Sequence, residues 1–131
     1  MNYLTKKDIL AVNDIVQEEV DVPEWGGAVL VQGLTGAARD RFEASILTKK
    51  GKKYDTNLAD MRAKMVALSV VDDDGALIFS EHDVKALSMK SAVALNRVFT
   101  VAQRLSGLTD DDMDELEKNS DGDQSGDSIL D

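Results

Sequence analysis

Residues 16–31 read Val-Gln-Glu-Glu-Val-Asp-Val-Pro-Glu-Trp-Gly-Gly-Ala-Val-Leu-Val, and their pattern sets the architecture expected for the whole chain. Valine-rich segments with strand patterns flank a central Pro-Glu-Trp-Gly-Gly segment that favours a turn. The pattern predicts a β-hairpin whose apolar side carries four valines: Val20, Val22, Val29 and Val31. We expect helices from the rest of the chain to cover this side, because an isolated hairpin is only marginally stable.

Helical patterns flank the hairpin. Before it, Thr5 and Asp8 have the spacing of a capping box, which predicts a short helix continuing through Ile9, Leu10 and Val12. After it, Thr35 is expected to cap a helix over residues 36–49, which repeats apolar residues at helical spacing and ends at the lysine-rich residues 49–53.

The second half of the chain continues this alternation of helices and turns. A helix is expected over residues 57–70, with Leu58, Met61, Met65 and Leu68 on one stripe. An acidic turn at 72–75 follows, and residues 77–79 are expected to return as a short strand beside residues 70–71.

Two further helices are expected before the end of the chain. Ser80 and Asp83 have capping-box spacing and open a short helix. Ser88 is expected to cap the last long helix, and Gly107 to stop it. Its apolar stripe comprises Ala92, Leu95, Val98, Phe99, Ala102 and Leu105. Residues 109–116 would add another helical turn or two, with acids where the helix dipole favours them.

Together these patterns predict a mainly α protein of the α+β class, with an N-terminal β-hairpin packed on a small bundle of four to five helices. The length of 131 residues suits one core. We therefore expect a single domain over residues 1–118 and a disordered acidic tail over 119–131, where only Ser, Gly, Asp and Gln occur after Asn119 until Ile129.

The net charge of −10 is concentrated at one end of the chain. From residue 109 onward there are ten acidic residues against one lysine, a net charge of −9, whereas the other 108 residues carry 14 bases and 15 acids. The body is therefore close to neutral, and the acidity belongs to the tail.

Several classes of protein are disfavoured by composition. The absence of cysteine excludes disulfides and thiolate metal sites. No signal peptide is recognisable, and no apolar run approaches the roughly 18 residues of a membrane span, which predicts a soluble protein.

The most suggestive sequence motif is one that resembles a calcium-binding loop. Asp72, Asp74 and Gly75 match positions three, five and six of an EF-hand loop, and Glu81 falls at position twelve. The first ligand position is Val70, however, which lacks the anchoring carboxylate. We therefore interpret this segment as a solvated acidic turn, and expect no metal and no cofactor.

No pattern favours catalysis or nucleic-acid binding. The single histidine, His82, lies in an expected capping turn between two acids, and no Walker loop or dinucleotide fingerprint is present. The four lysines within residues 49–53 raise the local potential, but only Tyr54 is available nearby for base stacking, and the acidic tail would compete for them.

We expect the chain to work by binding another protein. Trp25 is interpreted as either an exposed partner anchor or a lid over the core, since tryptophan serves both purposes. The candidates for partner contact are large apolar side chains: Trp25, Phe42, Met61, Met65 and Phe99.

Four segments, in order, carry a family resemblance. They are Val-Pro-Glu-Trp-Gly-Gly at 22–27, Arg-Asp-Arg-Phe-Glu at 39–43, Leu-Ser-Val-Val-Asp at 68–72 and Ala-Gln-Arg-Leu-Ser-Gly-Leu at 102–108. With the acidic end, they make residues 4–119 resemble the tail assembly chaperones of siphophages and related prophages.

The resemblance implies a protein without enzymatic activity that acts in the host cytoplasm and is absent from the mature virion. Such chaperones bind the tape measure protein and keep it soluble until the tail tube polymerises around it. The family typically makes a longer product by a −1 ribosomal frameshift, whose extension recruits the major tail protein. Self-association is a further expectation of the resemblance.

Two other functions are weighed against this one. An acidic regulator that mimics nucleic acid would inhibit a basic protein, but a mimic needs carboxylates spaced over a folded surface, and here the charge is in the tail. A small calcium sensor conflicts with the apolar residue at position 70.

Overall fold

The computed structural model describes residues 2–50, 53–56, 59–109, 111–112 and 115 of the chain. The predicted tail at 119–131 lies outside the described residues. The helices are α1 (Lys6–Ala11), α2 (Gly36–Ile46), α3 (Met61–Ser69), α4 (Val84–Ser88) and α5 (Ala92–Leu105), with 3-10 turns at Pro23–Trp25 and Glu81–Asp83. The strands are β1 (Gln17–Val22), β2 (Gly27–Gln32), β3 (Leu47–Lys50), β4 (Lys53–Thr56) and β5 (Val70–Val71).

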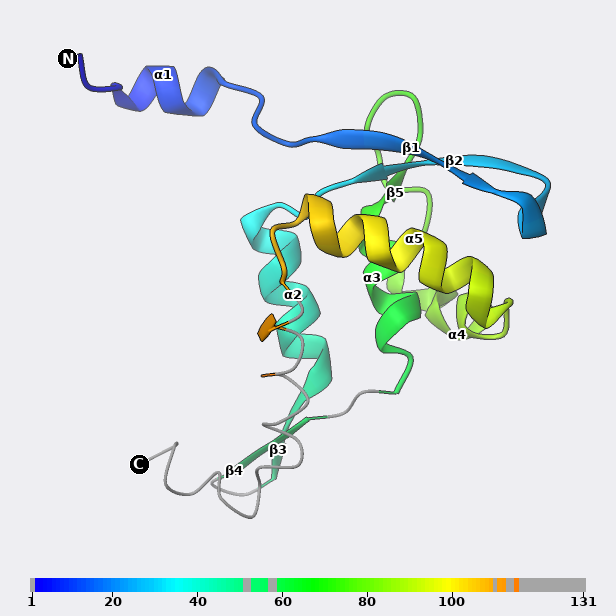
Figure 1. Cartoon of the computed structure of the whole chain (residues 1–131). Coiled ribbons are helices and arrows are strands. Elements are labelled where there is room, and N and C mark those ends of the chain that lie inside the picture. The colour runs from blue at the N-terminus through cyan, green and yellow to red at the C-terminus, as the bar shows by residue number, and fades with distance from the viewer. Residues whose placement is uncertain (1, 51–52, 57–58, 110, 113–114, 116–131) are drawn as a thin grey trace.

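The predicted hairpin and its helical cover are confirmed. Strands β1 and β2 pair antiparallel with Val20 opposite Val29, so the four valines share one face. Val20, Val22 and Val31 are buried on this face, and Val29 packs against them partly buried. Helix α5 runs along the hairpin (Figure 1) and buries Leu95, Val98 and other residues of its predicted stripe.

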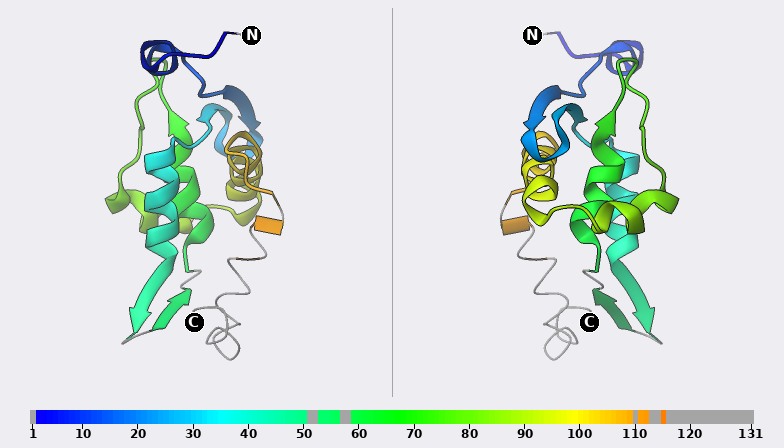
Figure 2. Two further views of the ribbon diagram at one scale, coloured as in Figure 1. Left: turned by 90° about the vertical axis from the view of Figure 1, so that its left-hand side faces the viewer. Right: turned by 90° about the vertical axis from the view of Figure 1, so that its right-hand side faces the viewer.

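Helix α3 is the centre of the helical layer. It contacts α2, α4 and α5 and buries Met61, Ala63, Met65, Val66 and Ala67, so several of its sides are covered. The two views of Figure 2 show α2 and α3 side by side below the three-stranded sheet. A helix covered on several sides shows a weak apolar stripe, which is why the sequence indicates only part of this burial.

The predicted N-terminal caps are confirmed for most of the helical segments and wrong for one. The boxes formed by Thr5 with Asp8 and by Ser80 with Asp83 are both complete, and Thr35 accepts a hydrogen bond from the Ala38 N–H. Ser88 does not cap α5: it is the last residue of α4, and its hydroxyl donates to the carbonyl of Lys85. The cap of α5 is Ser91, which accepts from the Ala94 N–H.

The C-terminal end of α5 is closed by the predicted glycine. Gly107 has φ +72°, and its N–H and that of Leu108 donate to the carbonyls of Arg104 and Gln103 at 3.1 and 3.0 Å. This is a Schellman motif, and it buries Leu108. Beyond it, Thr109 and Asp112 exchange backbone-to-side-chain hydrogen bonds, and residues 111, 112 and 115 are helical.

Three element boundaries differ from the prediction. The helix expected over 36–49 ends at Ile46, and residues 47–50 pair with 53–56 as a second hairpin, β3–β4. Thr48 and Tyr54 both favour extended backbone, and the lysines at 49, 50 and 53 belong to these strands; positions 51–52 lie outside the described residues. The helix expected from residue 57 begins at Met61; positions 57–58 lie outside the described residues.

The third difference concerns residues 70–71. They form β5, which pairs antiparallel with β2 and makes the sheet three-stranded in the order β1-β2-β5. The predicted return at 77–79 is reduced to one bridge between Val71 and Leu77. Valines at 70 and 71 are buried, and a strand in contact with β2 explains their place in the core.

Gly33 permits the closest contact between the sheet and α5. A Cβ at this position would lie 2.6 Å from the carbonyl oxygen of Leu105. The next residue, Leu34, donates its N–H to the hydroxyl of Ser106 at 2.9 Å. The end of β2 therefore lies directly against the backbone at the end of α5, with no room for a side chain at residue 33.

We expect Gly33→Ala to lower the free energy of unfolding by about 1–3 kcal/mol, the usual cost of overpacking. Gly36→Ala is the matched control, because a Cβ there meets nothing within 4 Å, and its unfolding free energy should be unchanged or slightly higher. Urea denaturation measures both. Equal stability of the two variants would contradict the close approach at Gly33.

Candidate functional site

The surface beside the hairpin tip holds two adjacent apolar crevices. One, of about 320 Å³, lies between α2, α3 and the start of α4 and is lined by Leu68, Leu77, Phe79 and Val84. The other, of about 500 Å³, has Trp25 and Leu87 among its lining residues, and it shares Phe79 with the first. We call these two crevices together the Phe79 surface.

Charged residues of both signs surround the Phe79 surface. The first crevice has Arg41, Lys64 and Glu81 at its walls. The second has Glu24, Asp83 and Lys90. An apolar floor with a mixed charged rim is the usual composition of a protein-binding surface, and it suits a partner with an apolar stripe flanked by polar residues.

Several large apolar side chains in and around the Phe79 surface are exposed to solvent. Leu77 and Ile78 are 43% and 50% exposed, and Met89, which follows α4, is 84% exposed. Phe79 and Val84 are half-buried and pack against the core. These residues lie in a connection and a short helix, where the sequence has no clear periodicity to mark them.

Trp25 is fixed at the edge of this surface by the neighbouring Glu24. The Glu24 carboxylate accepts two hydrogen bonds from Arg97 of α5, from Nε and Nη2, each at 3.0 Å. This bidentate pair joins the hairpin tip to the side of α5 and is geometrically well defined. The hydrogen bonds from Arg97 lower the pKa of Glu24 below its ordinary value.

The indole of Trp25 has an unusual environment. Its Nε1 is buried and has no hydrogen-bond partner among the described residues, although the ring as a whole is only half-buried. The ring also packs against the hydrophobic core. Trp25 therefore covers part of the core and also lines the Phe79 surface, and its role as a partner anchor stays a prediction.

The other four candidates for partner contact lie in the core. Phe42 and Met65 are completely buried, and Met61 and Phe99 are 8% and 6% exposed. Among the five candidates, the structure brings only Trp25 to the Phe79 surface. A contact of the others with a partner stays a prediction, and in this structure they act through the shape of the helices that they support.

The polar motifs have structural partners of their own. Asp72 Oδ1 accepts hydrogen bonds from the N–H groups of Asp74 and Ala76, which closes the acidic turn. His82 is exposed, and its N–H donates to the hydroxyl of Ser80. Within the part of the chain that the structure describes, no group of three or more His, Cys, Asp or Glu could hold a metal ion, and no helix is suited to cross a membrane.

The structure is thus a small α+β domain with an apolar, charge-rimmed surface, and the comparisons with known proteins give its family. Residues 6–119 match the phage tail assembly chaperones, so the chain belongs to this family. The resemblance inferred from the four sequence segments is thus confirmed.

A solved structure has a similar fold. The tail assembly chaperone of bacteriophage HK97 has the same fold, with a TM-score of 0.52 over 79% of this chain and 92% of that chain. The two sequences are 18% identical, so this likeness shows the fold alone. No curated protein matches the sequence.

The Glu24–Arg97 pair predicts a dependence of stability on pH. Because the folded-state pKa of Glu24 is lowered, its contribution is present above the unfolded pKa of about 4.3 and is lost as the pH falls through the folded value. We expect the difference in unfolding free energy between the unchanged protein and Glu24→Gln to be largest near pH 7 and to shrink below about pH 4.

Urea denaturation at a series of pH values measures this difference. Asp8 and Asp112, whose pKa values are also lowered, by hydrogen bonds from Thr5 and Thr109, titrate equally in both proteins and cancel. A difference that stays constant down to pH 3 would contradict the ion pair.

Proposed function

We propose that this chain binds the tape measure protein of its phage and keeps it soluble until the tail tube polymerises around it. It acts by binding, without catalysis, in the host cytoplasm, and it does not remain in the mature virion. Membership of the tail assembly chaperone family supports a role in tail assembly. The Phe79 surface supports the mode of binding.

The observation that carries the proposal is the pair of apolar crevices between helices. A long helical protein exposes an apolar stripe before it is enclosed, and such stripes aggregate in water. An amphipathic helix places anchors at positions i, i+3 or i+4 and i+7, which can enter neighbouring crevices in succession. The two crevices that meet at Phe79 offer this arrangement.

The rim charges and Trp25 would make the contact specific and orient the bound helix. Lys64 and Lys90 stand at different crevices, with Glu81 and Asp83 near them, so polar residues beside the stripe of the partner would find both signs of charge. The unpaired N–H of Trp25 would gain a hydrogen bond from a partner acceptor after a small adjustment of the ring. Tryptophan is also among the residues most enriched at binding hot spots.

The major tail protein is the second proposed partner, reached through a longer frameshift product. The codons of Lys118 and Asn119 can contain the heptamer A-AAA-AAC, on which ribosomes slip. We expect the gene to carry a slippery heptamer across codons 117–119. Reading the nucleotides checks this, and a gene without such a heptamer there would refute the frameshift.

Binding to the tape measure protein is tested by co-expression followed by size-exclusion chromatography. We expect the unchanged chain to bring the tape measure protein into the soluble fraction and to elute with it. Leu77→Asp places a charge on the Phe79 surface and should weaken the complex about tenfold, the effect of losing about 1.4 kcal/mol.

Leu10→Asp is the matched control, because Leu10 is an exposed leucine on α1, remote from the Phe79 surface, and the complex should persist. A urea midpoint for Leu77→Asp equal to that of the unchanged chain shows that its fold is intact. If the tape measure protein stays insoluble with the unchanged chain, the proposal is wrong; if Leu77→Asp binds normally, the Phe79 surface is not the site.

A further inference from the structure

The two crevices of the Phe79 surface differ in the sign of their charge. The charged residues that line the first crevice are Arg41, Lys64 and Glu81. Those that line the second are Glu24, Asp83 and Lys90. The first crevice therefore has a positive rim and the second a negative one, so an acidic ligand would favour the first.

Both basic residues of the first crevice can receive a carboxylate. The ion pairs formed among the described residues include neither Arg41 nor Lys64. Lys64 Nζ donates to the carbonyl of Ser45 at 2.9 Å, which holds the ammonium group at the crevice wall and leaves two of its three donors for a ligand. Leu77 and Phe79 line the same crevice, so it suits an apolar anchor flanked by acids.

The acidic tail, residues 119–131, has this pattern in its sequence. Its only large apolar residues are the adjacent Ile129 and Leu130. Asp127 and Asp131 lie two positions before and after Ile129. In an extended segment these three side chains would share one side, about 7 Å apart along the chain. The tail therefore carries one apolar anchor between two carboxylates.

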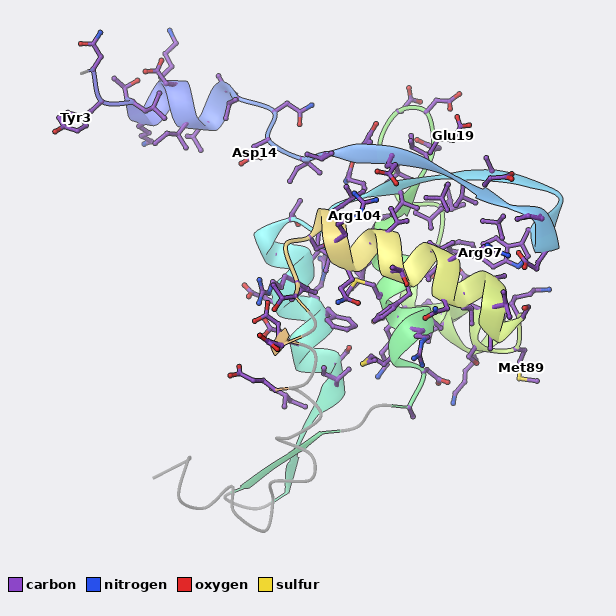
Figure 3. The ribbon with its side chains drawn as sticks, in the orientation of Figure 1. Tyr3, Asp14, Glu19, Met89, Arg97 and Arg104 are labelled. Carbon is purple, nitrogen blue, oxygen red and sulfur yellow. The ribbon has the colours of Figure 1, made fainter. Side chains whose placement is uncertain are left out.

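The chain leaves α5 beside the start of α2. Arg104, labelled in Figure 3, lies in the last turn of α5. Just after that turn, the Ser106 hydroxyl accepts a hydrogen bond from the N–H of Leu34, two residues before α2 begins. The buried Leu108 follows and fixes the direction in which the chain continues.

The next residues stay close to α2. Hydrogen bonds from Thr109 lower the pKa of Asp112, and attraction to Arg39 of α2 also lowers it. Arg39 is two residues before Arg41 in the same helix. The last described part of the chain therefore lies near the helix that contributes Arg41 to the first crevice.

The tail is long enough to reach this crevice. Ile129 is 14 residues beyond Glu115, the last described residue. At about 3.3 Å per extended residue, such a segment spans up to roughly 46 Å, whereas a domain of this size has a radius of gyration of about 13 Å. Covalent connection also gives the tail an effective concentration on the order of millimolar at its own crevice, so weak contacts suffice to hold it.

We propose that the acidic tail docks in the first crevice of its own chain. The apolar pair at 129–130 enters beside Leu77 and Phe79, and the flanking carboxylates lie near Arg41 and Lys64. The tail thereby covers an apolar crevice that would otherwise face water before the cargo arrives.

The effect of docking on the cargo rests on the proposed function. The tail and a helix of the tape measure protein would compete for one crevice, so the apparent affinity falls with the fraction of chains whose crevice is free. A tail docked in about nine of every ten chains weakens cargo binding about tenfold.

The docking is tested on the chain alone. Because the sequence has no cysteine, Ser125→Cys provides a single site for a nitroxide spin label near the anchor. We expect paramagnetic broadening of the backbone NMR signals to be strongest at residues of the first crevice, namely Leu68, Leu77 and Phe79.

Three further variants locate the contact. Ile129→Ser together with Leu130→Ser should abolish the broadening at the first crevice. Lys64→Gln should reduce it, whereas Lys90→Gln, the same change at the second crevice, should leave it unchanged. Equal urea midpoints of the two lysine variants show that their folds are comparable.

Four results would overturn the docking. They are broadening centred on the lysine-rich residues 47–56, broadening centred on the second crevice, broadening that persists without the apolar pair, and equal effects of the two lysine changes. Broadening of an unlabelled copy mixed with a labelled one would show that the tail docks on another chain, which also contradicts the proposal.

Competition with the cargo is tested by co-expressing the unchanged chain and the variant without the apolar pair, with different tags, together with the tape measure protein. We expect the variant to exceed the unchanged chain about tenfold in the purified complex. Equal amounts would show that the tail does not compete. If neither chain binds the tape measure protein, the proposed function is wrong, whereas the spin-label experiment still decides the docking.

Discussion

The structure depends on burying the apolar stripe of α5 from two directions. Leu95, Val98, Phe99 and Ala102 are covered by the β1–β2 hairpin and by α3, and each large side chain removed from water contributes about 1.5–3 kcal/mol. Two ion pairs hold the hairpin along the helix: Arg97 with Glu24 near the hairpin tip and Arg104 with Glu18 toward the other end. They are partly exposed and contribute little stability, but they fix the direction in which the hairpin crosses α5. The sheet and α3 both pack on α5, so this packing sets their positions in the fold.

This packing also determines which apolar surface stays free. The hairpin tip carries Trp25 to the start of α5, where it lies beside α4 and Phe79, and the crevices form where these elements meet. The long connection from β5 to α4 supplies Leu77 and Phe79 without covering them. At the other end of β1, the preceding helix α1 has no buried residue. The packing that builds the core therefore leaves the Phe79 surface and α1 exposed.

Sequence patterns predict the parts of this fold that depend on local periodicity. The valine face of the hairpin, the capping boxes and most of the α5 stripe with its glycine stop all follow from spacing within a few residues. Pairing of β5 with β2 depends on contacts between distant segments, and the β3–β4 hairpin competes with a helical pattern, so neither was predictable. The partner candidates show the same limit. Phe42, Met65 and Phe99 have the size and spacing of anchors, but core packing demands the same features. Phe79 and Leu77 lie in an irregular connection, where only the fold shows that they meet Trp25.

We propose that this tail assembly chaperone holds the tape measure protein on the Phe79 surface. Hydrogen–deuterium exchange of the chain, with and without the tape measure protein of its phage, examines that claim residue by residue. We expect slower exchange in the complex over residues 77–90 and at the hairpin tip, 23–26, with exchange in α1 changed little. Unchanged exchange in both of these segments, with protection confined to other parts of the chain, would contradict it.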